Sequence, residues 1–345
     1  MRAVFRYPIA PPFVHDRSLK TDIGYLLTDF VDKGELLSDT FSALKNDHRR
    51  RQNLFRDLSR ILLSLGKMPH PRIGSFTIDH QGFISLSNRP LTLRLHWLEN
   101  QGIPTDIGRQ TTYSTVESYV LDLLSYHDNR LIHQPNSINN VADGRKQMAA
   151  IALMRSVLQQ FIVSRQGPFI FTLTDIHQSN IFVDQDWHIT SLIDLEWACS
   201  LPVEMQQPPY WITGRDLDDL TGDRLGDFAL VRNEFMTIYQ QEEEHFAGAG
   251  FGRAQIMQRS WQLGGFWYFR ALATTKGFYN LYLQHIQPRF STDLPYKEVS
   301  SFWRQDAEQI LQSKLDHRQE YLRRLDAAAI SQRGSTEVES EQDDI

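Results

Sequence analysis

Apolar side chains recur at helical spacing through most of the chain. Between about 35 and 65 they stand three or four residues apart, as at Leu54, Leu58, Ile61 and Leu65, and Gly66 follows. This period places them on one face of an α-helix, and glycine is a common residue just past a helix end. The same spacing predicts further helices at about 114–129, 144–165, 226–245, 254–285 and 297–328. We therefore expect an α+β protein that is mainly helical.

Two segments show strand patterns instead. Residues 73–87 alternate around Gly82, which predicts a β-hairpin. The short apolar runs Ile181–Val183 and Ile189–Ile193 flank a polar corner at 184–187, and they predict a second hairpin. The second hairpin matters more, because polar residues with oxygen-bearing side chains stand at its entrance and exit.

These residues are Asp175 and Asn180 at the entrance and Asp194 at the exit. The hairpin between them gathers three oxygen ligands at one end. Phosphoryl transfer needs this set: one carboxylate accepts the proton of the substrate hydroxyl, and an Asn and an Asp hold Mg²⁺ against the nucleotide phosphates. The alternative is a surface hairpin in which Asp and Asn serve only as turn residues.

Residues 171–196 resemble the aminoglycoside phosphotransferase family, relatives of protein kinases, and most closely its fungal branch. The resemblance implies that Asp175 is the catalytic base and that Asn180 and Asp194 bind the metal. It also implies a protein-kinase-like C-terminal lobe, Mg²⁺ and ATP as cofactors, and phosphorylation of a small-molecule hydroxyl. His177 matches a His that members often carry in this loop, whereas Leu173 stands where the family usually has His.

A second match lies near the start of the chain. Gly24–Val31 reads as a buried strand, and a turn follows at Asp32-Lys33-Gly34. The segment resembles the family's hinge, whose backbone binds the adenine ring. The residues that this resemblance assigns to nucleotide binding are Thr28, Asp29, Phe30 and Val31.

In a complete member of the family, a sheet lobe with a phosphate-covering loop and a Lys precedes the hinge. Only Met1–Ile23 precede it here, and strands of about five or six residues with their connections do not fit a five-stranded sheet and a helix into that length. We therefore expect the N-terminal sheet lobe to be largely absent. The expected organisation is an N-terminal arm and hinge remnant at 1–34, a helical phosphotransferase lobe at 35–330, and an acidic, disordered tail at 331–345.

Three functions stay open. The first is an ATP-dependent small-molecule kinase. The second is a catalytically dead pseudokinase, or a ligand- or partner-binding module of the same fold. The third is a protein kinase, which is disfavoured because the loop lacks the His-Arg-Asp order and Asp194-Leu195-Glu196 replaces Asp-Phe-Gly.

Charge and composition narrow the partners. The formal net charge of −6 disfavours nucleic acid, and no apolar run reaches the roughly eighteen residues of a membrane span. A single cysteine, Cys199, suits a reducing compartment, so a cytoplasmic location is expected. A group of acids beyond the hairpin could form a negative wall for a cationic substrate, although helix capping and solvated loops explain them as well. These acids are Glu196, Asp216, Asp218 and Asp219.

Overall fold

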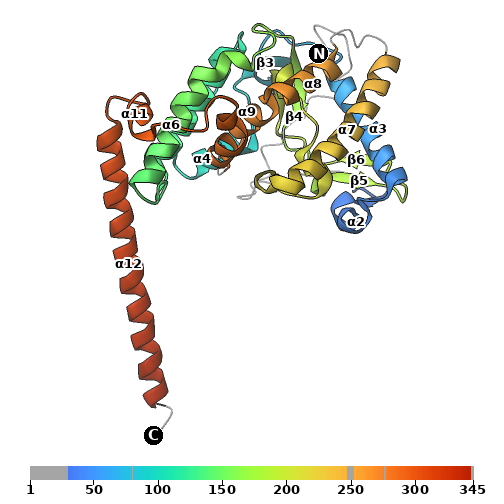
Figure 1. Cartoon of the computed structure of the whole chain (residues 1–345). Coiled ribbons are helices and arrows are strands. Elements are labelled where there is room, and N and C mark those ends of the chain that lie inside the picture. The colour runs from blue at the N-terminus through green and yellow to red at the C-terminus, as the bar shows by residue number, and fades with distance from the viewer. Residues whose placement is uncertain (1–29, 80, 247–251, 276, 343–345) are drawn as a thin grey trace.

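The computed structural model describes residues 30–79, 81–246, 252–275 and 277–342, with side chains up to Ala328. Within these residues the protein is α+β and mainly helical, with three small sheets (Figure 1). The helices are α2 (Leu37–Leu44), α3 (His48–Leu65), α4 (Leu93–Asn100), α5 (Val116–His133), α6 (Val141–Val157), α7 (Gly222–His245), α8 (Arg253–Leu263), α9 (Gly265–Leu272), α10 (Phe278–Leu281), α11 (Tyr296–Ser300) and α12 (Ala307–Gln342). The strands are β1 (Glu35–Leu36), β2 (Ser75–Ile78), β3 (Ile84–Asn88), β4 (Phe169–Leu173), β5 (Ile181–Val183), β6 (Ile189–Leu192) and β7 (Ala198–Pro202).

The strands that surround the expected site form two antiparallel units. β5 and β6 form a hairpin, and β1 pairs with β5 to make the order β1-β5-β6. β4, just before the hairpin, pairs with β7, just after it. The chain therefore leaves β4 in one loop, makes the hairpin, and returns to β7 through a second loop. Both loops lie at the junction of the two sheets, while β2 and β3 form a separate hairpin.

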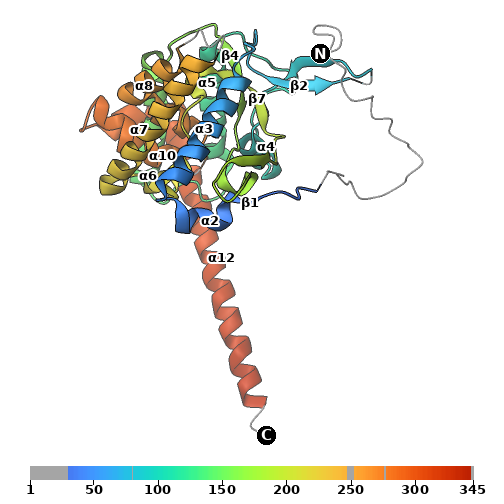
Figure 2. The same cartoon turned by 90° about the vertical axis from the view of Figure 1, so that its right-hand side faces the viewer.

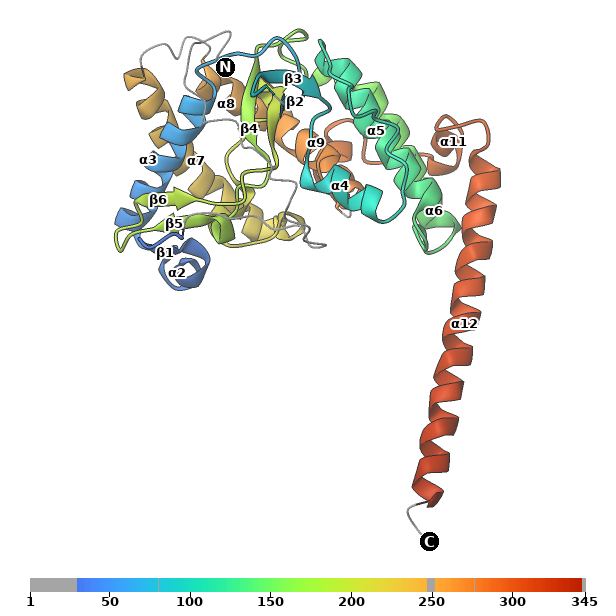
Figure 3. The ribbon, with the colours of Figure 1, turned by 180° about the vertical axis from the view of Figure 1, so that it is seen from behind.

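The β5–β6 hairpin packs against α2 and α3, the first two helices of the described chain (Figure 3). Trp187 at its corner is fully buried, and its ring stacks on Phe41 of α2 with ring centroids 5.5 Å apart. In α3, the Asp57 carboxylate accepts the backbone N–H of Ile189 at 3.0 Å, and Asn53 Nδ2 donates to Asp186 O at 3.0 Å. Helices near the start of the chain thus hold the hairpin from outside.

Helix packing builds the core around this frame. α3 lies against α7, where Phe55 and Phe235 meet edge to face with centroids 5.3 Å apart. On α9, Tyr268 stacks on Phe161 at 4.3 Å and donates its hydroxyl to Met154 O at 3.0 Å. The aromatic residues of α9 are therefore mostly core.

The last helix, α12, projects from the body (Figures 1 and 2). Its first turns are attached: Leu311 is buried, and Lys314 Nζ donates to Ile132 O at 2.8 Å and to Gln134 O at 2.7 Å. Farther along, Tyr321 and Leu325 are about half exposed. None of the helices in the described part of the chain combines the length and the apolar character that a membrane span requires.

Most expected elements are present, with several differences. The expected helices at 35–65 and 297–328 are each divided, the first into α2 and α3 and the second into α11 and α12. The segment 254–285 is divided, because Gly264 adopts a left-handed conformation (φ 89°) between α8 and α9, and the chain leaves the helix again after Leu272. The backbone of α12 is helical as far as Gln342, past Ser331, where the composition predicts the start of a disordered tail. The tail itself stays a prediction.

Another difference concerns the hinge. Residues 1–29 lie outside the described part of the chain, so only Phe30 and Val31 of the predicted strand can be compared. Neither is in a strand, and Phe30 is 90% exposed, so the buried strand is not found at these two positions. No described strand pairs with them, and Val31 is only partly buried.

Candidate functional site

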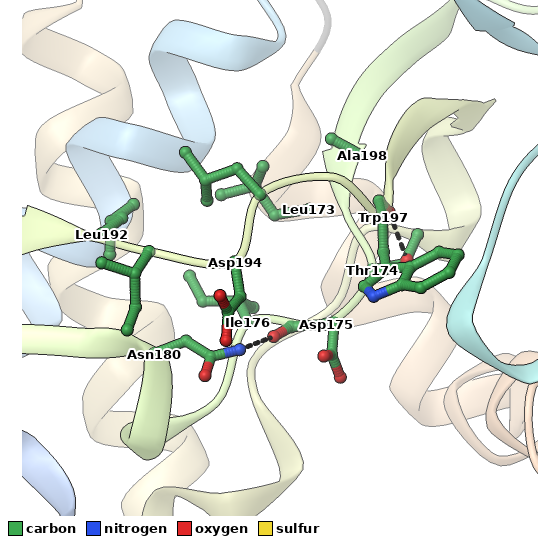
Figure 4. Close-up of a pocket in the computed structure, with 11 residues that line it drawn as sticks. Leu173, Thr174, Asp175, Ile176, Asn180, Leu192, Asp194, Trp197 and Ala198 are labelled. Atoms are coloured by element: carbon green, nitrogen blue, oxygen red, sulfur yellow. Dashed lines mark hydrogen bonds between the residues drawn. The ribbon is translucent and has the colours of Figure 1, made fainter. Parts of the chain in front are cut away.

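The loop that carries Asp175 begins directly after β4. Leu173 ends this strand opposite Ala198 of β7, so the sheet fixes where the loop starts. The hydroxyl of the next residue, Thr174, donates to Trp197 O and joins the two loops (Figure 4). Strand pairing and this hydrogen bond therefore hold the start of the loop in place. Leu173 occupies the position where the resemblance calls for His.

Asn180 closes the same loop. Its side-chain Nδ2 donates to the backbone carbonyl of Asp175 at 3.0 Å, which folds residues 175–180 into a compact bend (Figure 4). Its backbone carbonyl accepts the N–H of Ile193 at 3.1 Å, so the second loop is attached as well. Because Nδ2 is engaged, the amide oxygen Oδ1 is left as the ligand atom, and it accepts only the exposed hydroxyl of Ser179 at 3.2 Å.

Asp194 stands beside Asn180 in the second loop (Figure 4). Its backbone lies in the left-handed region (φ 54°), and its side chain is exposed. Asp tolerates this conformation better than most residues, and such backbone strain concentrates at functional sites. The structure therefore brings Asp175, Asn180 and Asp194 together from one loop and its neighbour.

Burial and neighbouring charges set the electrostatics of Asp175. Burial raises the pKa of its carboxyl above the ordinary value, the guanidinium of Arg94 and the ring of His177 oppose the rise, and the carboxylates of Glu196 and Asp194 add to it. Burial also lowers the pKa of His177, with Asp175 opposing. A carboxylate with a raised pKa holds a proton more readily than a free one, as a general base must.

These side chains open into a cleft of about 670 Å³. This volume lies within the range of small-molecule sites, about 300–1,000 Å³. Much of the wall is apolar and comes from α3, α5 and α9, while charged groups stand at several points of its lining. The charged side chains other than Asp175 and Asp194 are Arg94, Asp216, Asp218 and Arg270.

The donor set fits Mg²⁺. Asn180 Oδ1 and the Asp194 carboxylate are hard oxygen ligands, and Mg²⁺ is usually held by one or two carboxylates together with substrate phosphates and water. Among the residues that the structure describes, no group of three or more His, Cys, Asp and Glu side chains could hold a metal ion by itself. A Mg²⁺ ion held by Asn180 and Asp194 would need further oxygen ligands, such as water.

Only some of the other predicted site residues lie in the cleft lining. Thr28 and Asp29 lie outside the described residues, and the nucleotide-binding role of Phe30 and Val31 stays a prediction. Of the expected acidic wall, Asp216 and Asp218 line the cleft, whereas Asp219 forms an ion pair with Arg224 at 3.4 Å. Glu196 is exposed and acts on Asp175 only through its charge.

Many lining residues have no counterpart in the sequence expectations, and Arg94, Tyr210 and Arg270 are among them. Arg94 comes from α4, Tyr210 follows Pro208-Pro209, and Arg270 comes from α9. They are far apart along the chain and share no motif, so only the fold brings them into one cleft.

Comparison of the chain with models of protein families, with curated proteins and with solved structures finds no match. The resemblance to the phosphotransferases consequently rests on the residues of the two loops and on their arrangement.

Proposed function

We propose that the protein transfers a phosphoryl group from ATP to a hydroxyl of a small molecule, using a protein-kinase-like lobe. The observation that supports this function best is the hydrogen bond from Asn180 Nδ2 to Asp175 O. The bond uses the amide nitrogen of Asn180 and the backbone oxygen of Asp175, so the carboxylate of Asp175 and Oδ1 of Asn180 are left for ligands. A turn residue on an inert surface hairpin has no need of this linkage.

Each of the three residues has one role. Asp175 holds the substrate hydroxyl and takes its proton as the hydroxyl oxygen becomes bonded to phosphorus and the bond to the leaving nucleotide breaks. Asn180 and Asp194 would hold Mg²⁺. When bound, Mg-ATP would supply the phosphoryl group and the metal would neutralise charge on the phosphates.

The loop variants test the proposal in purified protein. Release of ADP is measured with a panel of small alcohols, including amine-bearing ones because Asp216 and Asp218 line the cleft. Asp175→Asn should lower kcat about 10²–10⁴-fold, the contribution of a positioned base. Asp194→Asn should abolish turnover, with partial recovery in excess Mg²⁺, and Asn180→Ala should act more mildly because water can replace one ligand. Asp186→Asn, at the far end of the hairpin, is the matched control. Full activity in Asp175→Asn would overturn the assignment.

A second candidate is a ligand-binding module of the same fold that performs no phosphoryl transfer. It is favoured by the exposure of Phe30, because the segment that should bind adenine contains no strand at that point. Calorimetry with Mg-ATP separates the two candidates. The kinase requires saturable binding that weakens in Asp194→Asn, and the module requires none.

A further inference from the structure

Arg270 of α9 is a cation in the lining of the cleft without a carboxylate partner. Its only hydrogen bond in the described structure runs from Nη2 to Pro208 O at 3.3 Å. Its Nε is buried and has no partner. The guanidinium lies 5.6 Å from the ring centroid of Tyr210 and 5.7 Å from that of Phe266, so aromatic faces replace water around it.

Other poorly exposed arginines of this chain have more polar contacts than Arg270. Arg232, which is fully buried and also has no carboxylate partner among the described residues, donates to Gln258 Oε1 at 3.2 Å and to Met257 O at 3.1 Å. Arg89 forms an ion pair with Glu99 at 2.6 Å, and Arg155 pairs with Asp128. Arg253 binds the carbonyls of Leu62 and Leu63 at the end of α3, both at 3.0 Å. A guanidinium taken out of water needs such partners, because an unpaired buried charge is costly. Arg270 has one long hydrogen bond and an open cleft beside it.

A second cation faces the same region. Arg94 on α4 is exposed, lines the cleft and has no hydrogen bond or ion pair within the described residues. Both arginines act on the phenol of Tyr210: burial raises the pKa of Tyr210, and Arg270 and Arg94 oppose the rise. Asp216 and Asp175 also reach Tyr210 and act in the opposite sense. Two guanidinium groups and one phenol therefore converge on one part of the cleft.

The acidic side chains of the cleft do not form an ion pair with Arg270. Neither Asp216 nor Asp218 forms an ion pair with it, and both carboxylates are exposed. Exposed carboxylates are solvated and require no partner, whereas the partly desolvated guanidinium of Arg270 does. The partner that the structure calls for at this point is an anion.

We propose that Arg270, with Arg94 and Tyr210, binds the anionic group of the small molecule that occupies the cleft. The group is a carboxylate or a phosphate, since both match the planar fork of an arginine. The anion subsite stands on its own. Its consequence for substrate class, an alcohol that also carries an acidic group, rests on the proposed phosphoryl transfer.

Anion binding can be measured without nucleotide, metal or turnover, so the result is independent of the proposed function. Malonate and inorganic phosphate are titrated into the full chain at constant ionic strength in Mg²⁺-free buffer, with thermal melting and calorimetry as readouts. At least one anion should raise Tm saturably. Arg270→Met should weaken its binding about tenfold or more, the usual loss for a charge-assisted hydrogen bond. Arg94→Gln should weaken it less, and Arg109→Gln, an exposed arginine outside this cleft, should leave it unchanged.

The relative affinities of the two anions identify the group: tighter malonate binding indicates a carboxylate, and tighter phosphate binding a phosphoryl group. If Arg270→Met does not fold, two other measurements test the proposal. One is anion binding by Arg270→Lys, and the other is the NMR resonance of the Arg270 side-chain Nε–H in the unmodified protein. The lysine variant should bind more weakly, and the resonance should shift on titration. Equal binding by Arg270→Met, a resonance that does not move, or stabilisation only by amines such as ethanolamine would each overturn the proposal.

Discussion

The carboxylate of Asp57 in α3 accepts the backbone N–H of Ile189, the first residue of β6, at 3.0 Å. It also accepts Nδ1 of His188 at 3.2 Å. A helix near the start of the chain thereby fixes the strand whose far end leads to Asp194. The position of the loop that carries Asp194 depends on this contact as well as on the hairpin itself.

Replacing Asp57 with Ala should therefore destabilise the protein by about 1–3 kcal/mol, because the partly buried N–H of Ile189 loses its acceptor. Urea denaturation measures the loss. The control is Asp186→Ala in the same hairpin, whose exposed side chain lies 3.5 Å from Arg49. An exposed pair of this kind is worth about 0–1 kcal/mol. Equal effects of the two substitutions would mean that Asp57 does not hold the hairpin.

Substitutions at Gly66 and Arg253 should have non-additive effects on the free energy of unfolding. A methyl group on Gly66 would stand 1.9 Å from Nη1 of Arg253, and this guanidinium binds the last carbonyls of α3. Gly66→Ala should cost about 2 kcal/mol or more through displacement of the guanidinium, since its own backbone (φ −85°) is ordinary. After Arg253→Met the same substitution should cost much less.

A double-mutant cycle of Gly66→Ala and Arg253→Met measures this coupling as a departure from additivity. Gly226→Ala is the control, because the added methyl meets nothing within 4 Å in α7 and should stabilise the protein by about 1 kcal/mol. Additive losses in the cycle would show that Gly66 acts on something other than Arg253.

The sequence predicts those features whose determinants are close together in the chain. Asp175, Asn180 and Asp194 stand in one stretch, and the strands between them carry their own pattern, so their convergence could be expected. Arg94 and Arg270 belong to helices 176 residues apart (270 − 94), and their common cleft depends on how α4 and α9 pack. The break at Gly264 was missed because apolar residues continue on both sides of it.

The outer part of α12 should contribute little to stability. Residues 319–328 are mostly exposed, and an isolated helix in water is stabilised mainly by its own weak propensity. Ending the chain after Arg318 should leave Tm within about 1 °C of the full-length value. By contrast, Lys314→Met removes both hydrogen bonds to the end of α5 and should lower the free energy of unfolding by about 1–3 kcal/mol. A shortened chain that melts several degrees lower would show that the outer segment packs on the body.

Asp175 should stabilise the fold less than an uncharged residue of the same shape. Burial raises the pKa of its carboxyl, so the folded state binds the proton more tightly than the unfolded state, whose value is near 3.8. The ionised side chain therefore costs stability at neutral pH, and this cost disappears as the pH falls below the unfolded value. Asp175→Asn should therefore raise the free energy of unfolding at pH 7.

The same shift sets the pH dependence of turnover. Only the ionised carboxylate can accept a proton, so kcat/KM should fall on the acidic side at a higher pH than an ordinary Asp would give. Melting of Asp175→Asn and of the unmodified protein at several pH values, together with the pH profile of phosphorylation, measures both effects. Asp186→Asn serves as the exposed control and should show no such gain at pH 7. A variant that is less stable than the unmodified protein at pH 7, but equal to it at low pH, would mean that the Asp175 carboxylate is stabilised by its surroundings rather than desolvated by them.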